Sequence, residues 1–361
     1  MDSFYMKKAI GLAKKARGAT HPNPMVGALI VKKGVIIASG FHKKAGLDHA
    51  EVIALKKAGE KAKGATLYVN LEPCSHFGKT PPCVDRIIKS GLKRVVIGTE
   101  DPNPINTLKG IKKLKKSGLI VNAGILREES VKLNEDFAKF ITRKVPFVII
   151  KAAQSLDGKI ASVSGDSKWI SCLNSRKYAH KLRAESDAVM VGIETVIKDN
   201  PRLDCRLYKS FTGQPLKIVV DSRLRISLKA KILNNPGAQT LIATTRYAPK
   251  DKIRKLEAKN ARVLIVRSRN KRVDLKDLFI KLAKENIVSI LVEGGARLIT
   301  SLINQRLADK IVIFIAPKII GGSNAPTFCE GKGIKKMKDA IVLNGISAKR
   351  INGDLIVEAY L

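Results

Sequence analysis

The chain has 361 residues, 45% of them hydrophobic, and its 68 Lys and Arg against 31 Asp and Glu residues give a formal net charge of +37. This content of apolar residues excludes collagen-like, low-complexity and broadly disordered chains, and the length favours two domains. No apolar run approaches the roughly 18 residues that a membrane helix needs. The five cysteines are too few for a disulfide-rich secreted domain. We therefore expect a cytoplasmic protein with no membrane contact.

The positive charge is spread over the chain as pairs of lysines, and no block of five or more like charges forms a basic tail. This pattern favours a solvated surface, so we expect no nucleic-acid partner. A polyanion partner is the alternative. A basic surface would also attract small phosphorylated substrates, so the charge alone does not discriminate between them.

Apolar periodicity predicts alternating strands and helices in residues 1–144, which indicates an α/β layer domain. We expect strands at 26–31, 35–41, 65–71, 93–99 and 119–125. We expect helices at 4–16, 49–58, 81–90 and 108–117, and one longer helix that ends near Arg143.

The Val145-Pro146 pair marks a break, because a proline disfavours helix at the residue before it. Strand and helix patterns then restart, so residues 145–361 are predicted to form a second α/β domain. Its expected strands are 147–153, 188–191, 217–220, 240–244, 262–266, 289–292 and 310–316. Its expected helices are 175–185, 275–285 and 296–304.

One imidazole and two thiols in the first half have the character of zinc ligands, namely His49, Cys74 and Cys83. Three protein ligands leave the fourth tetrahedral position for water, which is the arrangement of catalytic zinc sites. Zinc lowers the pKa of a bound water to about 7, so that hydroxide is available at neutral pH. Glu51 lies two residues after His49, and from a first helical turn it could reach this water as a proton shuttle. Zinc deaminases use such a set, although the two cysteines here are farther apart than in the usual P-C-x-x-C motif.

Three other interpretations of these residues stay open at this point. The cysteines could be small core residues beside a surface histidine, or they could hold a purely structural zinc ion. A deaminase acting on a flipped nucleic-acid base would fit the charge, but only Phe41 and Phe77 are available near the zinc loops for stacking. A basic nucleic-acid-binding protein with a zinc knuckle would need four protein ligands and salt-sensitive binding.

The motifs of both halves resemble the bifunctional riboflavin-biosynthesis deaminase–reductase family. In the first half these are the segments at 21–27, 40–42, 49–51, 72–83 and 101–104, including the Cys-to-Cys segment Cys74-Ser75-His76-Phe77-Gly78-Lys79-Thr80-Pro81-Pro82-Cys83. In the second half they are the segments at 155–161, 167–170, 199–203 and 292–296. The resemblance covers essentially the whole chain in the family's order. One departure is the segment 106–110, which has a single Gly where the family is often richer.

The resemblance implies a cytidine-deaminase-like three-layer α/β/α domain followed by a dihydrofolate-reductase-like α/β domain. It implies two consecutive reactions on a phosphorylated pyrimidine. A phosphoribosylated diaminopyrimidinone first loses an amine by hydrolysis, and NADPH then reduces the ribosyl group to a ribityl chain. A homo-oligomer is compatible with the sequence. The pyrimidine and phosphate pocket of the deaminase would be lined by Asn23, His42, His76, Lys79, Asp101 and Asn103.

The second half lacks a G-x-G-x-x-G fingerprint, and a Glu-Gly-Gly turn stands between a strand and a helix instead. Two glycines there would let a pyrophosphate approach the N-terminus of the helix. The resemblance assigns NADPH contacts to Ala153, Trp169, Thr195, Asp199, Ser222, Gly295, Ala296 and Arg297. It assigns substrate contacts to Lys151, Ser167, Arg183, Leu203, Arg206 and Glu293. The alternatives are a plain tight turn, a core tryptophan and an arginine on a helix surface.

Overall fold

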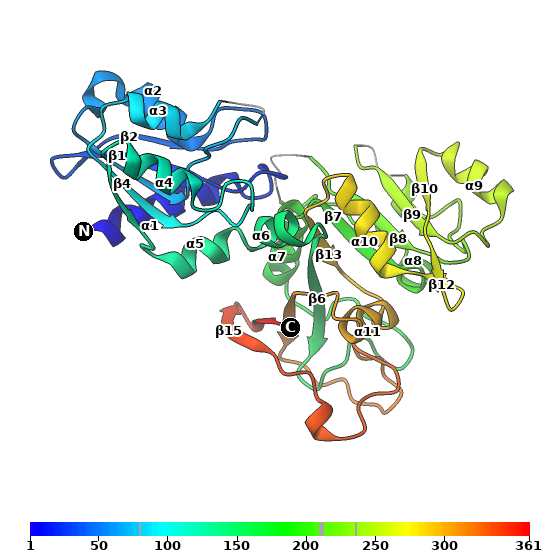
Figure 1. The fold of residues 1–361 in the computed structure, drawn as a ribbon. Coiled ribbons are helices and arrows are strands. Elements are labelled where there is room, and N and C mark those ends of the chain that lie inside the picture. Colours follow the sequence, from blue (N-terminus) through cyan, green and yellow to red (C-terminus); the bar gives the residue numbers. More distant parts are fainter. Residues whose placement is uncertain (79–80, 209–212, 235–236) are drawn as a thin grey trace. The chain divides into compact units, whose positions relative to one another are not determined.

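A computed structural model describes residues 1–78, 81–208, 213–234 and 237–361 of the chain (Figure 1). The chain separates into two compact units, Met1–Val145 and Pro146–Leu361. Each unit is an α/β structure built around its own sheet, as the alternating sequence pattern predicts. None of the described helices combines the length and the apolar character that crossing a membrane requires.

The first unit contains a sheet with the strand order β2-β1-β3-β4-β5. Strand β1 pairs antiparallel with β2 and β3, whereas β3, β4 and β5 run parallel. The carboxyl ends of β3 and β4 therefore meet at one edge. The strands are β1 Gly27–Lys32, β2 Val35–Phe41, β3 Thr66–Leu71, β4 Arg94–Thr99 and β5 Ile120–Ala123.

Helices cover both faces of this sheet and give three layers. One core lies between the sheet and the layer of α2, α3 and α4, where Val84, Ile87 and Leu114 are buried. The other core lies against α1 and α5, with Met6 and Leu133 buried in it. The helices are α1 Asp2–Ala13, α2 Ala50–Ala58, α3 Cys83–Lys89, α4 Lys109–Lys116, α5 Arg127–Leu133 and α6 Glu135–Arg143.

The single longer helix expected up to Arg143 is wrong, because the structure divides this segment into α5 and α6 at Asn134. The Asn134 backbone leaves the helical region, with φ −116° and ψ 30°. Its side-chain amide accepts a hydrogen bond from the Met25 N–H at 2.7 Å and donates one to the Met25 carbonyl at 3.0 Å. Asparagine favours such local breaks, and these long-range bonds hold the break in place.

The second unit contains a nine-stranded sheet among the described residues, in the order β10-β9-β8-β7-β13-β6-β14-β16-β15. The first seven strands in this order, β10 through to β14, run parallel to one another. Strand β16 pairs antiparallel with β14, and β15 pairs antiparallel with β16. Its strands are β6 Phe147–Ser155, β7 Ala188–Gly192, β8 Leu216–Val220, β9 Thr240–Thr244, β10 Ala261–Ile265, β13 Ser289–Val292, β14 Lys310–Ala316, β15 Asn344–Ile351 and β16 Asp354–Tyr360. A separate two-stranded ribbon pairs β11 Ser268–Arg269 with β12 Arg272–Val273.

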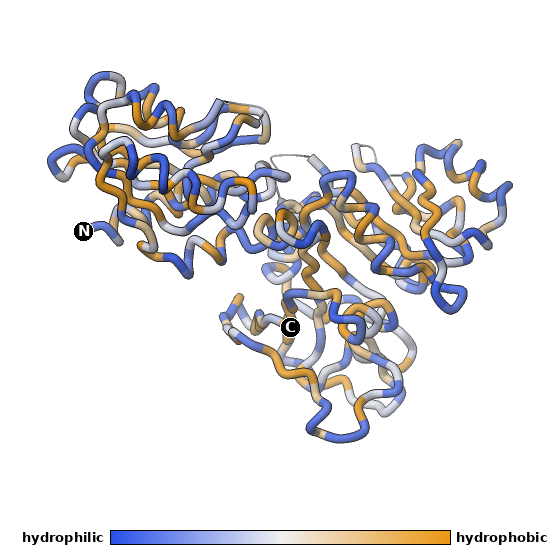
Figure 2. Tube along the Cα trace, viewed as in Figure 1, coloured by the Kyte–Doolittle hydropathy of each residue, from blue (hydrophilic) through white to orange (hydrophobic). Residues whose placement is uncertain are grey.

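Helices again cover both faces. Helices α10 and α11 bury Phe279 and Leu302 against one face, while α8 and α9 bury Val196 and Leu256 against the other. The helices are α7 Leu173–Ala184, α8 Ile193–Asp199, α9 Lys250–Glu257, α10 Leu275–Lys284 and α11 Ala296–Asn304. In both units the strands are mostly apolar and the connecting loops mostly polar (Figure 2).

Candidate functional site

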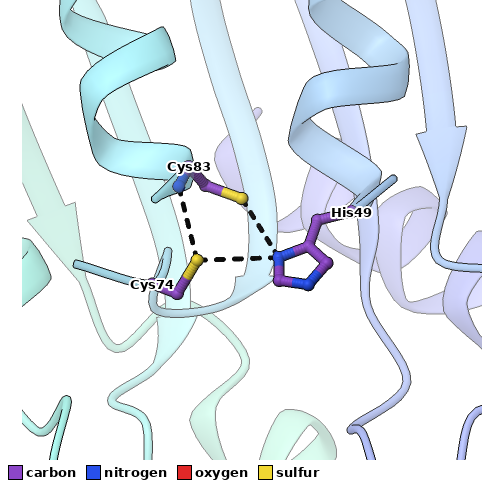
Figure 3. Close-up of side chains that lie close together, drawn as sticks. All are labelled: His49, Cys74 and Cys83. Atoms are coloured by element: carbon purple, nitrogen blue, oxygen red, sulfur yellow. Dashed lines mark hydrogen bonds between the residues drawn. The ribbon is translucent and has the colours of Figure 1, made fainter. Parts of the chain in front are cut away.

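Three side chains from separate elements converge in the first unit (Figure 3). His49 stands directly before α2 as its N-cap residue, and Cys83 is the first residue of α3. Cys74 lies in the loop that follows β3. The two prolines before Cys83 explain where α3 starts, because proline is well tolerated at a helix start and not in its interior.

The ligand atoms of His49, Cys74 and Cys83 all lie within 4.8 Å of one another. His49 Nδ1 is 3.2 Å from the Cys83 sulfur and 3.6 Å from the Cys74 sulfur. The Cys83 N–H donates to the Cys74 sulfur at 3.3 Å. The hydrogen bond between the two thiols lowers the pKa of Cys74 to about 4 and raises that of Cys83. One sulfur is therefore readily a thiolate, the form that binds metals.

Glu51 is buried in the first turn of α2, and its Oε2 atom has no hydrogen-bond partner in the described structure. Burial raises the pKa of its carboxyl to about 7, against the opposing charge of His49. A carboxyl with a pKa near neutrality can both accept and release a proton.

His42 and Asn23 form a fixed pair beside this cluster. The His42 ring lies edge-on to the His49 ring, with 5.2 Å between the centroids. His42 Nδ1 is 3.2 Å from the Asp48 carbonyl, so it carries the proton and donates. Its Nε2 then accepts from the Asn23 side-chain amide at 3.1 Å. Burial lowers the pKa of His42, which favours the neutral ring.

Asp101 and Asn103 follow β4 and shape the adjacent loop. Asp101 is buried, and burial raises its pKa. Its carboxylate accepts a hydrogen bond from the Asn103 N–H at 2.9 Å. The Asn103 side chain accepts one from the Ile105 N–H at 3.2 Å, so it supports a turn here. His76 is close enough to Asp101 for their charges to interact, and its Nδ1 is buried without a partner in the described structure. Lys79, expected at this pocket, lies outside the described residues.

Sequence reasoning missed the role of Glu72, the residue before Pro73-Cys74. Its buried carboxylate accepts hydrogen bonds from three backbone N–H groups, those of Asp101, Leu108 and Ile111, each at 3.0 Å. It thereby joins the end of β3 to the start of α4. The position of Glu72, two residues before the candidate ligand Cys74, was the only signal of this role in the sequence. Its hydrogen-bond partners are remote in sequence, so they could not be predicted.

In the second unit, three charged side chains meet where β6 and β13 lie side by side. The register pairs Val292 with Ile150, so Glu293 follows β13 next to Lys151. Arg183 of α7 forms a two-pronged ion pair with Glu293, whose second bond is 2.8 Å long. The Lys151 ammonium is 3.7 Å from the same carboxylate. Burial alone would raise the pKa of Glu293, but the positive charges of Arg183 and Lys151 lower it to about 2.

The Glu-Gly-Gly turn after β13 has a backbone conformation that favours glycine. Gly294 has φ +142°, and a Cβ there would lie 3.3 Å from Thr195 Oγ1. The same hydroxyl accepts a hydrogen bond from the Gly295 N–H at 2.9 Å. Gly295 is the N-cap of α11, and the N–H groups of Ala296 and Arg297 follow in its first turn, where a helix offers no acceptor of its own.

The other predicted cofactor residues lie mostly at carboxyl ends of parallel strands. Ala153 is near the end of β6, Ser222 follows β8, and Asp199 ends the helix after β7. The Ser222 hydroxyl accepts a hydrogen bond from the Val273 N–H at 3.0 Å. Trp169 is 59% exposed, so it is not a core residue, and the Arg176 guanidinium stacks 4.0 Å from its ring centroid.

The remaining predicted substrate residues differ in their surroundings. Ser167 is half-buried, and Leu203 is buried with a left-handed backbone, φ +51°. The Arg206 side chain is exposed and pairs with Asp204. Arg183 also donates to the Asp204 carbonyl at 2.8 Å, so the two arginines meet at this one residue.

The RibD C-terminal domain family matches residues 146–356, and the zinc-binding region of cytidine and deoxycytidylate deaminases matches residues 1–99. A riboflavin biosynthesis protein RibD from Aquifex aeolicus is 47% identical over 99% of this chain and 98% of its own length. The chain belongs to the RibD family. It is thus a riboflavin biosynthesis protein with a deaminase domain and a reductase domain.

Solved structures agree with this membership. RibD from Acinetobacter baumannii superposes with a TM-score of 0.87 at 36% identity, covering 99% of this chain and 98% of that one. A diaminohydroxyphosphoribosylaminopyrimidine deaminase/5-amino-6-(5-phosphoribosylamino)uracil reductase from Thermotoga maritima gives 0.86 at 37% identity, with the same coverage. Escherichia coli RibD is 40% identical over 94% of both chains. Both units are therefore folded as in complete family members.

Proposed function

We propose that this chain catalyses two consecutive steps. The first is the hydrolytic deamination of 2,5-diamino-6-(5-phosphoribosylamino)pyrimidin-4-one. The second is the NADPH-dependent reduction of the ribosyl group, which gives 5-amino-6-(5-phosphoribitylamino)uracil. The observation that carries the proposal is the convergence of His49, Cys74 and Cys83 beside the buried carboxyl of Glu51.

This donor set fits zinc. One imidazole nitrogen and two sulfurs lie within a sphere small enough for one ion, and they leave one tetrahedral position for a small ligand. A zinc ion bound there supplies Lewis acidity, which makes water a nucleophile near neutral pH. Glu51 is the proton carrier in this proposal. Its unpartnered Oε2 would take one proton from the attacking water and pass it to the ring nitrogen. It would then take the second proton from the new hydroxyl and pass it to the amine, which leaves as ammonia while the carbonyl forms.

The pyrimidine would be held by Asn23, His42, His76, Asp101 and Asn103, with Lys79 toward its phosphate. The fixed His42–Asn23 pair supports this role. Because the Asn23 amide nitrogen is already committed to His42 Nε2, the direction of the Asn23 side chain is set before substrate arrives. The unpartnered His76 Nδ1 offers a further polar contact.

For the second step, the N-terminus of α11 supports a site for the pyrophosphate of NADPH at Gly295, Ala296 and Arg297, because helix N-termini favour anions. Ala153, Trp169, Thr195, Asp199 and Ser222 would complete the cofactor site. The substrate sugar and its phosphate would contact Lys151, Ser167, Arg183, Leu203, Arg206 and Glu293. The cofactor supplies the hydride, while the protein supplies position and charge.

The Lys151–Glu293–Arg183 cluster holds two cations around one buried carboxylate, which leaves one positive charge beside the proposed sugar site. That excess charge favours a phosphorylated substrate. We also propose that the protein acts in the cytoplasm, where its free cysteines would stay reduced.

The test is incubation of the purified chain with the phosphorylated diaminopyrimidinone, with and without NADPH. Ammonia release and cofactor absorbance are followed separately. We expect ammonia without NADPH, and NADPH oxidation only after deamination. Oxidation of NADPH without ammonia release would refute the proposed order, and no ammonia from zinc-loaded protein would refute the deaminase step.

A further inference from the structure

Cys74 lies outside regular secondary structure, so the sheet does not fix its position by itself. Its carbonyl accepts a hydrogen bond from the Val84 N–H at 3.2 Å. The peptide groups on either side of it are held by another residue. Asn106 Oδ1 accepts from both the Ser75 N–H and the Ser75 hydroxyl at 2.8 Å, and its Nδ2 donates to the Pro73 carbonyl at 3.4 Å.

Asn106 is itself firmly held. Its side chain is completely buried, and its Nδ2 donates to the Asp101 carboxylate at 3.0 Å. The Asn106 N–H donates to the Asn103 carbonyl at 2.8 Å. The Ser75 N–H can only donate and the Asp101 carboxylate can only accept, so these two partners fix which way the Asn106 amide faces.

We propose that Asn106 is a positioning residue for deamination, which holds the Pro73–Cys74–Ser75 segment so that the Cys74 sulfur faces His49 and Cys83. This proposal rests on the zinc site of the proposed function. An asparagine suits the position because one buried side chain must both accept from Ser75 and donate to Asp101. An apolar residue would leave both partners unsatisfied, and an aspartate would set a second carboxylate against Asp101.

If Asn106 orients the loop that carries Cys74, its loss should affect metal binding as well as stability. Partners that orient a metal ligand typically contribute 10–100-fold to metal affinity or activity. If Asn106 acts in this way, its loss will weaken zinc binding and lower the deamination rate together. The reductase unit provides an internal reference in the same chain, because the hydrogen bonds of this network that the described residues form all lie within residues 1–145.

The experiment compares Asn106→Asp with the unaltered full-length chain by zinc titration against a competing chelator, by deamination kcat and by reductase rate with deaminated substrate supplied directly. We expect zinc affinity and deamination kcat to fall about 10–100-fold and the reductase rate to change less than about twofold. The control is Met6→Ala, which removes a fully buried side chain from α1, across the sheet. It should lower stability but leave zinc affinity unchanged.

A second variant separates positioning from general destabilisation. Asp101→Asn combined with Asn106→Asp exchanges the donor and the acceptor. The carboxylate at position 106 can still accept from Ser75, and the amide at position 101 can donate to it, but the hydrogen bond to the Pro73 carbonyl is lost. We expect this double variant to regain part of the zinc affinity and to bind zinc at least about threefold more tightly than Asn106→Asp, which is a measurable part of a typical 10–100-fold outer-shell loss. Unchanged affinity in Asn106→Asp, or an equal loss in Met6→Ala, would overturn the proposal. An unaltered chain that takes up no zinc would instead refute the proposed function.

Discussion

Lys217 of β8 is a completely buried lysine outside the proposed sites, and we predict that Lys217→Met stabilises the reductase unit. Among the described residues, the ammonium donates a hydrogen bond to the Ile232 carbonyl at 3.3 Å, and the Asp204 carboxylate is the charge that favours its protonated form. Burial lowers its pKa from 10.5 to about 8. Methionine has a similar length and no charge, so it can fill the same space.

The expected gain follows from these values. A tenfold change in proton affinity corresponds to about 1.4 kcal/mol, so a pKa lowered from 10.5 to about 8 means that keeping this ammonium charged costs the folded state at most about 3.4 kcal/mol. The lost hydrogen bond offsets about 1 kcal/mol of that, while the attraction to Asp204 is already included in the lowered pKa. The Ile232 carbonyl keeps a partner, because the Thr240 hydroxyl donates to it at 2.9 Å. We therefore expect a net gain of about 1–2 kcal/mol near neutral pH.

Calorimetry of the full-length chain can measure this gain. NADPH should raise the transition of the reductase unit, because a ligand stabilises the unit that it binds. Lys217→Met should raise that same transition by about 3–6 °C. Lys284→Met, which removes an exposed lysine from α10, is the charge-matched control and should shift it little.

The pH dependence gives the prediction its sign. The folded state holds the Lys217 proton less tightly than the unfolded chain, so the cost is complete below pH 8 and disappears as the pH rises to about 10.5. The advantage of Lys217→Met should therefore be largest at pH 7 and shrink above pH 8. An advantage that stays constant up to pH 10, or a variant less stable than the unaltered chain at pH 7, would refute this reasoning.

Three further predictions concern single substitutions. Glu51→Gln should keep zinc, measured by metal analysis, but lower the rate of ammonia release by several orders of magnitude; near-normal turnover would remove Glu51 from the proton-carrying role. Glu293→Gln should destabilise the reductase unit by about 3–5 kcal/mol, seen in the NADPH-responsive calorimetric transition, because Arg183 and Lys151 lose their buried counter-charge; an unchanged transition would contradict this. Leu108→Gly should stabilise the deaminase unit by about 1 kcal/mol, because Leu108 adopts a left-handed backbone with φ +61°. Chemical denaturation of the zinc-loaded chain measures this change, and a lower free energy of unfolding in the variant would contradict it.

The elements that could be predicted from the sequence are those whose signal is local. Strand β13 and helix α11 occupy the predicted ranges, because an apolar run and a Gly-Gly turn define them directly. The strands β15 and β16 had no such signal. All of β15 except Ile351 is exposed, so its sequence lacks the alternation that marks a half-buried strand. The short helices α8 and α9 were missed as well.

The candidate site divides in the same way. The cysteines and His49 could be assigned to one cluster because each stands beside a proline or at a predicted helix start. Asn106 gave no such signal, because its proposed role depends on hydrogen bonds to Ser75 and Asp101 that form only in the folded chain. Buried hydrogen bonds between remote loops cannot be derived from periodicity, because periodicity reports only which face of an element is apolar.

The two units place their candidate residues by the same physical rule, although their chemistry differs. In the first, Cys74 and Asp101 follow the adjacent parallel strands β3 and β4; in the second, Glu293 follows β13. Parallel strands end at one edge, where the chain must turn into helices whose N-terminal N–H groups lack acceptors. Polar side chains such as Glu72 satisfy that backbone, since its carboxylate accepts from the Leu108 and Ile111 N–H groups at the start of α4. The groups that complete the fold at this edge therefore also fix the loops that carry the reactive residues, so substitutions there should change activity and stability together.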